Sequence, residues 1–199
     1  DARIEEIPAR DEPEWVKKVM RPISIQKGDD VPVSAFAGEL DGSYEWTGPD
    51  GTFPVDTTQY EKRHIAINVP EWNPDSCIMC NQCAFVCPHS VLKPVLLNEE
   101  EAAKAPSTFV TKDTKAKQLV GLKYRLQVFI DDCTGCGNCA DICPVNQKGK
   151  DAPALTMLPL ETQREEQEPN YKFADTVSPK PDLMPKTTVT GSQYQESLF

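Results

Sequence analysis

The sequence lacks any long apolar run and has no excess of positive charge. Hydrophobic residues make up 39% of its 199 residues, and no stretch approaches the ~20 consecutive apolar residues of a membrane-spanning helix. The formal net charge is −10, which argues against nucleic acid or an anionic membrane surface as a partner. The first residues, DARIEEIPARDEPEW, are not a signal peptide and do not begin with Met. We therefore expect a cytoplasmic piece of a longer chain that binds neither membrane nor nucleic acid.

Several motifs of common enzyme sites are also missing from the sequence. It has no glycine-rich phosphate loop, no GxSxG nucleophile motif and no nucleotide-binding fingerprint. It also lacks the Gly-Asp-Gly segment with a downstream Asn that is typical of thiamine diphosphate sites. Because hydrophobic residues are few and prolines number 18, the chain can bury only a modest core and needs another element to organise its fold.

Cysteine, in contrast, is abundant and regularly spaced. All eight cysteines lie in two segments, DSCIMCNQCAFVCPHS at 75–90 and DCTGCGNCADICPVN at 132–146. Each segment has the spacing C-x2-C-x2-C-x3-C-P, and every cysteine of the second copy lies 56 residues after its counterpart in the first. The two copies supply Cys77, Cys80, Cys83 and Cys87, and then Cys133, Cys136, Cys139 and Cys143.

Three kinds of site could use so many thiols. Disulfides suit an even count, but crowded C-x-x-C-x-x-C steps give neighbouring cysteines poor bridging geometry. Structural zinc uses C-x-x-C pairs separated by a longer loop, whereas here three thiols at every third residue are followed by Cys-Pro. The spacing of bacterial [4Fe–4S] ferredoxins matches both copies without a mismatch. We therefore expect the eight cysteines to be the iron ligands of two [4Fe–4S] clusters.

The fourth cysteine of each copy is expected to serve the other cluster, as it does in two-cluster ferredoxins. The two expected ligand sets are Cys77, Cys80, Cys83 with Cys143, and Cys133, Cys136, Cys139 with Cys87. Within the loops, Gly135 and Gly137 allow close backbone approach or a positive φ, so that backbone N–H groups can point at cluster sulfurs. Ile78 and Met79 would cover the first loop with apolar atoms.

The two copies also predict the fold. A β-prone run precedes each cysteine segment, HIAINV at 64–69 and YRLQVFI at 124–130, and a helix-compatible stretch carries each fourth cysteine. Strand, cysteine loop, helical turn and strand make one half. Two such halves, related by pseudo-two-fold symmetry, make an α+β domain of the two-cluster bacterial ferredoxin-like type. In this fold the clusters take the place of a large hydrophobic core.

This ferredoxin-like domain is expected at residues 61–160, with an insertion at about 97–120 and long irregular extensions at both ends. Residues 1–60 should form a short helix and then an irregular wrapping arm. Residues 161–199 are polar and interrupted by prolines, so we expect an extended strap there rather than a second domain.

Within the extensions and the insertion, local signals predict three features. A helix is expected at 13–20, with Pro13 suited to its first turn. Asn98 and Glu101 have the spacing of a capping box, for a helix that must end before Pro106. The aromatic residues expected to anchor the arm are Phe36, Tyr44, Trp46 and Phe53.

The remaining candidate residues carry weaker signals. His89 could lie near a cluster, but all eight iron sites are already matched by cysteine, so neither His89 nor His64 is expected to be functional. Phe85 and Tyr124 could line an electron route, although core packing is the expected role of both.

Outside the cysteines, the sequence resembles one enzyme family over nearly its whole length. The segments that carry the resemblance are VPVSAF at 31–36, DGTFPVDTTQYEKRHIAINVPEW at 50–72, CIMCNQCAFVCPHSVLKPVL at 77–96, CTGCGNCADICP at 133–144, PLETQREEQEPNYKFADTV at 159–177 and GSQYQESLF at 191–199. They are similar to the pyruvate:ferredoxin oxidoreductase family, in particular to the two-cluster domain of its single-chain form.

This resemblance implies that the chain works as part of a larger enzyme. The family oxidises a 2-oxo acid such as pyruvate with coenzyme A to an acyl-CoA and carbon dioxide. Its electrons pass through three [4Fe–4S] clusters to ferredoxin or flavodoxin. This chain would hold the two outer clusters. Thiamine diphosphate, Mg²⁺ and the third cluster would belong to the rest of a homodimeric holoenzyme, toward which the strap at 161–199 would lead.

Two alternatives remain open. A free-standing two-cluster ferredoxin would be a soluble electron carrier and not part of an enzyme, although the long extensions on both sides of the cluster domain favour the enzyme segment. The other alternative is an interaction module that is stabilised by iron–sulfur clusters but has no redox turnover. The presence of two clusters makes this alternative less expected than a single cluster would.

Overall fold

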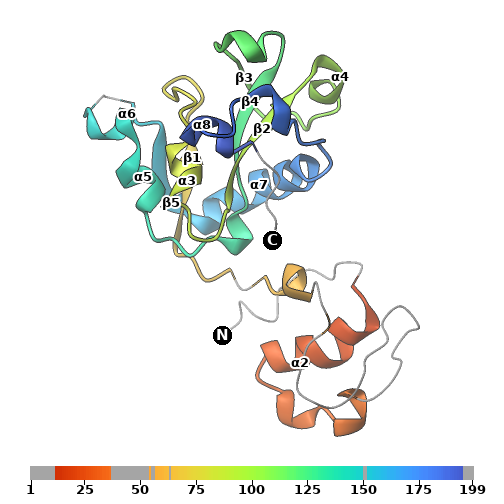
Figure 1. Cartoon of the computed structure of the whole chain (residues 1–199). Coiled ribbons are helices and arrows are strands. Elements are labelled where there is room, and N and C mark those ends of the chain that lie inside the picture. The colour runs from red at the N-terminus through yellow and green to blue at the C-terminus, as the bar shows by residue number, and fades with distance from the viewer. Residues whose placement is uncertain (1–11, 37–53, 55–56, 63, 150–151, 195–199) are drawn as a thin grey trace. The chain divides into compact units, whose positions relative to one another are not determined.

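The computed structural model describes residues 12–36, 54, 57–62, 64–149 and 152–194. The chain divides into two compact units, residues 1–63 and residues 64–199 (Figure 1). Among the described residues, no helix is both long enough and apolar enough to cross a membrane.

The N-terminal unit is built on one helical segment. Its π-helical part, η1 (Val16–Met20), continues directly into α2 (Arg21–Ser24). The helix predicted at 13–20 is therefore confirmed and extends further. The Lys17 N–H donates to the Pro13 carbonyl at 3.2 Å, which places Pro13 in the first turn, where a helix does not need its missing N–H. The buried side chains of this segment are Trp15, Val16, Val19 and Met20.

The described parts of the predicted arm contain only short turns. These turns are η2 (Gly28–Asp30), η3 (Val33–Phe36) and η4 (Thr57–Tyr60). Of the predicted aromatic anchors, Phe36 packs against the buried side chains of the helical segment. Tyr44, Trp46 and Phe53 lie outside the described residues.

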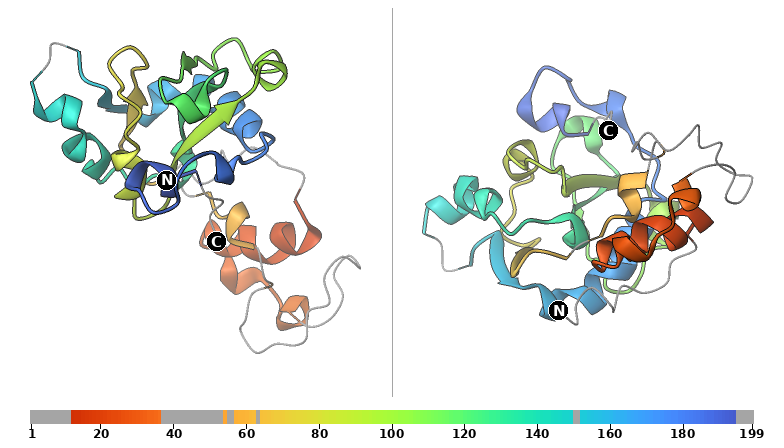
Figure 2. Two further views of the ribbon diagram at one scale, coloured as in Figure 1. Left: turned by 45° about the horizontal axis from the view of Figure 1, so that its top comes forward. Right: turned by 90° about the horizontal axis from the view of Figure 1, so that it is seen from below.

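The C-terminal unit contains two small antiparallel sheets. In one sheet β1 (Asn68–Trp72) pairs with β5 (Leu155–Pro159), and in the other β2 (Leu92–Leu97) pairs with β4 (Lys123–Val128). The short strand β3 (Lys112–Asp113) adds to the second edge of β4 (Figures 1 and 2).

These strands belong to two interleaved halves. One half runs from β1 through α3 (Gln82–Phe85) to β2, and the other runs from β4 through α5 (Asn138–Ile142) and α6 (Pro144–Gln147) to β5. The first strand of each half pairs with the last strand of the other, and α3 contacts α5. The predicted α+β, ferredoxin-like fold is confirmed.

The main hydrophobic core includes the cysteine loops as well as the sheets. Val69 and Ile130 are fully buried, and each large aliphatic side chain buried in this way contributes roughly 1.5–3 kcal/mol. Tyr124 is 1% exposed and packs edge-on against Trp72, with 5.9 Å between the ring centroids. Because Cys83, Cys133 and Cys139 belong to the same buried cluster, packing the core also positions the thiols.

The strand predicted at 64–69 is wrong in its bounds. β1 begins only at Asn68, because Asn68 pairs with Pro159, the last residue of its partner strand β5, after which the chain turns into a helix. The alternating apolar residues of the prediction, Ile65 and Ile67, are 61% and 76% exposed and do not face the core.

Other elements lie close to their predicted positions. The strand predicted at 124–130 corresponds to β4, after which η6 (Ile130–Asp132) turns the chain into the second cysteine segment. In the insertion, α4 (Glu99–Ala102) begins with the predicted capping box, in which Asn98 and Glu101 each accept the other's backbone N–H at 2.8 Å. A single turn, η5 (Lys117–Leu119), precedes β4.

The extended strap predicted after Leu160 is wrong, because residues 160–174 form the 15-residue helix α7 (Leu160–Ala174). Its many Glu and Gln residues are good helix formers. The N–H that Pro169 lacks would have paired with the carbonyl of exposed Glu165, where water can replace it. Two shorter helices follow, η7 (Pro181–Leu183) and α8 (Val189–Ser192).

A polar layer joins α7 to β4, and α7 also contacts β1 and β5 (Figures 1 and 2). Arg125 is only 4% exposed and donates to Gln127 Oε1 at 2.8 Å, to the Val110 carbonyl at 3.0 Å and to Gln167 Oε1 at 3.3 Å. Its guanidinium lies 4.5 Å from the centre of the Phe109 ring. Burial lowers the pKa of Arg125 to about 10, so the group is still cationic at neutral pH. The helix is therefore fixed by polar contacts that an apolar sequence pattern does not reveal.

Candidate iron–sulfur sites

The cysteines lie on two loops and on the helical turns that follow them. The first loop, residues 77–83, leads from β1 into the first turn of α3, which contains Cys83, and Cys87 follows α3. The second loop, residues 133–139, leads from η6 into α5, and Cys143 follows α5. All eight cysteines are free thiols, not disulfides.

Two small cavities each bring four cysteines together. The first cavity, with a volume of about 20 Å³, is lined by Cys77, Cys80, Cys83 and Cys143. The second cavity, also of about 20 Å³, is lined by Cys133, Cys136, Cys139 and Cys87. Each cavity therefore combines three thiols of one motif with the fourth thiol of the other motif.

The exchange of the fourth cysteine follows from the packing of the two halves. α3 and α5 contact each other, and each carries its last cysteine away from the loop that precedes it. Cys143 packs in a small buried cluster with Val145 and Ala154, against which Cys77 also packs.

Apolar side chains form much of the remaining wall of both cavities. Trp72, Tyr124 and Leu126 line the first cavity, and Val91 and Met157 line the second. Such walls limit the access of water to the buried thiols, and solvent exposure is one of the factors that set the potential of an iron–sulfur cluster.

Burial keeps several thiols protonated when no metal is bound. It raises the pKa of Cys83 and of Cys139 to about 12, from an ordinary value of 9.0, and the negative charge of neighbouring thiolates adds to the effect. The pKa of Cys133 is also raised, by burial and by nearby Cys87. For Cys80, burial and the charges of Cys77 and Cys143 act in the same direction. Four thiolates so close together need a positive partner, which iron supplies.

The arrangement differs from that of a site for one metal ion. Among the described residues, no three His, Cys, Asp or Glu side chains converge on a single metal position. A [4Fe–4S] cluster takes one thiolate at each iron, so its four ligands surround a space and do not meet at a point.

The backbone of the two loops repeats the same unusual geometry. Met79 and Gly135, 56 residues apart, have φ values of 58° and 71°, and Asn81 and Gly137 have 58° and 81°. The Met79 N–H donates to Cys77 Sγ at 3.4 Å, and the Gly135 N–H donates to Cys133 Sγ at 3.3 Å. The positive φ expected at both glycines is confirmed. Each loop can therefore direct backbone N–H groups toward sulfur.

Asn81 is a structural residue of the first loop that the sequence reasoning missed. It is 1% exposed, its Oδ1 accepts a 2.9 Å hydrogen bond from the Tyr124 hydroxyl, and its Nδ2 donates to the Thr190 carbonyl at 3.0 Å. Thr190 Oγ1 in turn donates to the Cys80 carbonyl at 3.1 Å. A signal was present, because Asn81 corresponds to Gly137 at the 56-residue spacing, and Asn tolerates a left-handed φ better than most residues.

The other predicted residues have mixed outcomes. Tyr124 is buried in the core as expected, and it also lines the first cavity. Phe85 does not pack in the core, since it is 59% exposed. His89 is exposed at the rim of the second cavity. His64 Nδ1 lies 2.9 Å from Asp131 Oδ1, so it supports the turn before Cys133.

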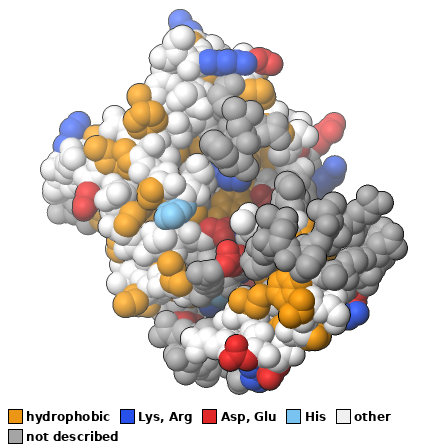
Figure 3. Space-filling view, turned by 60° about the horizontal axis from the view of Figure 1, so that its bottom comes forward, with side chains coloured by type: hydrophobic (Ala, Val, Ile, Leu, Met, Phe, Trp, Pro, Cys, Tyr) orange, Lys and Arg blue, Asp and Glu red, His pale blue; other side chains and the backbone are white. Residues whose placement is uncertain are grey.

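The two residues predicted to cover the first loop with apolar atoms, Ile78 and Met79, lie in different surroundings. Ile78 lines the first cavity but is 55% exposed, whereas Met79 packs against the main core. On the surface, Figure 3 shows apolar side chains in several small groups, with a histidine exposed among them.

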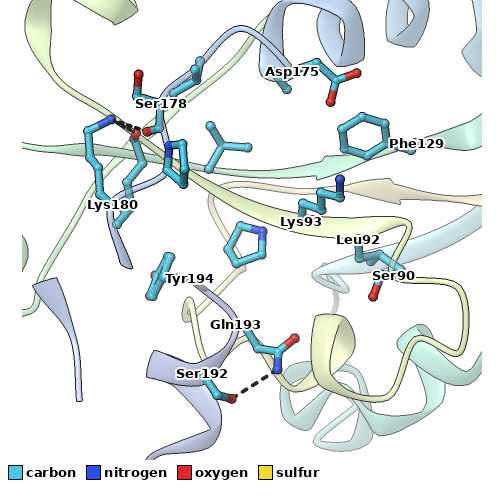
Figure 4. A pocket seen from close by; sticks show the side chains of 16 residues that line it. Ser90, Leu92, Lys93, Phe129, Asp175, Ser178, Lys180, Ser192, Gln193 and Tyr194 are labelled. Atoms are coloured by element: carbon cyan, nitrogen blue, oxygen red, sulfur yellow. Dashed lines mark hydrogen bonds between the residues drawn. The ribbon is translucent and has the colours of Figure 1, made fainter. Parts of the chain in front are cut away.

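A larger cavity, of about 640 Å³, lies beside β2, and no cysteine lines it. Its walls come from β2, from the end of α7 and from residues 192–194, and Figure 4 shows Lys93, Lys180 and Tyr194 around it. The ammonium group of Lys180 is held by Glu101 and by the Leu96 carbonyl, which ties the segment after α7 to β2.

Comparison with known proteins agrees with this geometry. Residues 76–146 match the family model of the 4Fe-4S double cluster binding domain. Residues 3–66, which precede this double-cluster domain, match EKR, a domain of unknown function.

Several curated relatives align over nearly the whole chain. Pyruvate:ferredoxin oxidoreductase from Moorella thermoacetica is 49% identical over 95% of this chain, and pyruvate-flavodoxin oxidoreductase from Enterobacter agglomerans is 47% identical over 94%. The mitochondrial pyruvate dehydrogenase [NADP(+)] of Euglena gracilis is 39% identical over 94%. The predicted resemblance is confirmed. The chain spans 15%, 14% and 9% of these relatives' lengths, and so it corresponds to one segment of such oxidoreductases.

Proposed function

We propose that this chain is the electron-transfer segment of an enzyme that oxidises a 2-oxo acid, and that its eight cysteines hold two [4Fe–4S] clusters with exchanged fourth ligands. One observation carries the ligand assignment. Each of two apolar cavities is lined by three cysteines of one motif and the last cysteine of the other. Clusters in these cavities would be bound by Cys77, Cys80, Cys83 and Cys143, and by Cys133, Cys136, Cys139 and Cys87.

The residues of the chain suit this role in three ways. The loops present three thiols each and direct the N–H groups of Met79 and Gly135 toward sulfur, which favours negative charge at that place. The largely apolar walls limit the access of water. The contact between α3 and α5 holds the two cavities at a fixed separation. When bound, a [4Fe–4S] cluster supplies the ability to accept and release one electron without making or breaking covalent bonds to a substrate.

The names of the relatives support the class of reaction. They act on pyruvate and name ferredoxin, flavodoxin or NADP(+) as the acceptor. We propose that the enzyme containing this chain oxidises pyruvate with coenzyme A to acetyl-CoA and carbon dioxide, with ferredoxin or flavodoxin as the acceptor. Thiamine diphosphate, Mg²⁺ and a third cluster would lie elsewhere in a homodimeric holoenzyme. Relatives that name three different acceptors share this segment. Its own role would therefore be to conduct electrons inside the enzyme.

The alternative of a free-standing ferredoxin is less well supported. The similarity to long oxidoreductases continues well beyond the double-cluster domain and covers 94–95% of the chain. A small carrier would not need the helical unit formed by residues 12–36 or the α7 helix.

Iron and acid-labile sulfide content, measured beside intact mass, tests the proposal. We expect about eight irons and eight sulfides per chain, in two clusters that titrate at roughly −400 mV or below. Stoichiometric zinc, or a single cluster per chain, would contradict the cofactor assignment. Two clusters that both titrate above about −150 mV would contradict the assigned pathway.

A further inference from the structure

Lys112 brings a positive charge to one cysteine loop. Its side chain extends from β3, and its Nζ donates to the Cys77 carbonyl at 2.7 Å and to the Pro74 carbonyl. The residue is half-buried, and both of these acceptors are neutral backbone groups. Its charge therefore lies directly beside the backbone of the loop that lines the first cavity.

The second loop has different surroundings at the equivalent place. Cys133 corresponds to Cys77 at the 56-residue spacing, and Asp131 corresponds to Asp75 in the same way, but Asp131 is buried whereas Asp75 is exposed. Asp131 accepts a 2.5 Å hydrogen bond from the Tyr171 hydroxyl and lies 2.9 Å from His64 Nδ1. Lys112 belongs to the connection between the two halves, which the pseudo-two-fold symmetry does not repeat. The two cavities are thus alike in their thiols, and Lys112 adds to the first loop a positive charge that is not part of the repeat.

We propose that Lys112 is a positioning residue that raises the reduction potential of the cluster held by Cys77, Cys80, Cys83 and Cys143, so that this cluster is the more easily reduced of the two. This inference rests on the proposed function. Reduction adds one electron, and hence one negative charge, to a cluster that is already surrounded by thiolates. A fixed cation close by stabilises the reduced form more than the oxidised form, and charge and hydrogen bonding beyond the ligands tune cluster potentials.

The loop does not depend on Lys112 alone for its shape. The Cys77 N–H donates to the Asn73 carbonyl at 3.1 Å, and Asn73 Oδ1 accepts the Asp75 N–H at 3.0 Å. The Cys80 carbonyl is held from the other side by Thr190. A variant without the charge at Lys112 should therefore still bind its cluster, and an effect on potential can be separated from an effect on folding.

The experiment is a redox titration with dithionite, monitored by electron paramagnetic resonance, of the full chain loaded with iron and sulfide. The variant K112Q removes the charge but keeps a hydrogen-bond donor, and K112R keeps the charge. K123M is the matched control, because Lys123 pairs with exposed Asp113 on the neighbouring strand. We expect K112Q to lower one of the two midpoint potentials by about 59 mV. For a one-electron reduction this corresponds to a change of about tenfold in the equilibrium constant. K112R and K123M should leave both potentials unchanged.

Equal shifts of both potentials, or no shift, in K112Q that still holds eight irons would overturn the inference. Loss of a cluster in K112Q would also overturn the inference, because it would show that Lys112 holds the loop in place. A shift of about 59 mV in K112R, which keeps the charge, would contradict the role of the charge as well. Iron content of the parent chain tests the proposed function separately, because a parent chain without two clusters would refute that function before any potential is compared.

Discussion

Met79 and Gly135 occupy equivalent positions in the two cysteine loops and adopt the same left-handed backbone conformation, with φ values of 58° and 71°. Each donates its N–H to the sulfur of the cysteine two residues earlier, at 3.4 and 3.3 Å. A left-handed φ is free of steric cost only for glycine. The first loop therefore stores backbone strain at Met79 that the second loop avoids, which indicates that the geometry itself is required.

Substitutions of the two glycines of the second loop should separate backbone strain from steric conflict. G137A should cost roughly 1–2 kcal/mol for its positive φ alone, because no atom lies within 4 Å of the added Cβ. G135A should cost a further ~1–3 kcal/mol, because its Cβ would lie 2.9 Å from the Asn68 carbonyl oxygen. Thermal loss of the cluster absorbance measures both effects.

G137N is the control for this pair, since it copies the residue found at Asn81, and it should be tolerated better than G137A. Equal losses in G135A and G137A would show that the approach to Asn68 does not constrain the loop.

The proposed exchange of ligands predicts which thiols C87A exposes. Removing the Cys87 ligand should weaken the cluster in the second cavity, so that its three other cysteines become reactive. Mild alkylation followed by peptide mapping should label Cys133, Cys136 and Cys139. It should leave Cys77, Cys80, Cys83 and Cys143 protected.

C143A is the mirror-image control and should reverse the pattern of labelling. Labelling of Cys77, Cys80 and Cys83 in C87A would mean instead that each motif binds its own cluster with all four of its cysteines.

Removing the Gln167 side chain should destabilise the junction between α7 and β4. Q167A leaves a donor of buried Arg125 without the acceptor that now lies 3.3 Å away, and an unsatisfied buried polar group costs roughly 1–3 kcal/mol. E165A, on the exposed face of the same helix, should change stability by no more than about 0.5 kcal/mol. Unfolding followed by circular dichroism distinguishes the two variants. Equal effects would show that the contact with Arg125 contributes nothing to stability.

Iron binding should weaken as the pH falls. The pKa values of Cys83 and Cys139, raised by burial to about 12, mean that both thiols are protonated at neutral pH without metal. Each must lose a proton to bind iron, so the apparent affinity should fall by up to about tenfold per thiolate for each pH unit. Competition with a chelator between about pH 6 and about pH 8.5, corrected for the chelator's own protonation, measures this. An affinity that does not change with pH would show that the thiols are already ionised in the free chain.

The sequence by itself determined the features that depend on local spacing. The two cysteine motifs predicted eight iron ligands, and their 56-residue separation predicted two similar halves. The helical turns after each loop, the strand at β4 and the capping box of Asn98 and Glu101 follow from neighbouring residues that interact within one or two turns. Gly135 and Gly137 predicted a left-handed backbone conformation, because few other residues adopt it at low cost. These features need no knowledge of distant contacts.

Only the tertiary structure decided the features that join distant parts of the chain. The sequence of the α7 helix is so polar that it does not predict a packed helix. Its buried Gln167 nevertheless accepts hydrogen bonds from Arg125 and Gln127. Lys112 reaches a loop 35 residues earlier, and Thr190 reaches Cys80 across 110 residues. The pairing of β1 with β5 and of β2 with β4 places Cys143 beside the first loop and Cys87 beside the second. Such contacts depend on how the two halves pack against each other, and no periodicity within either half encodes them.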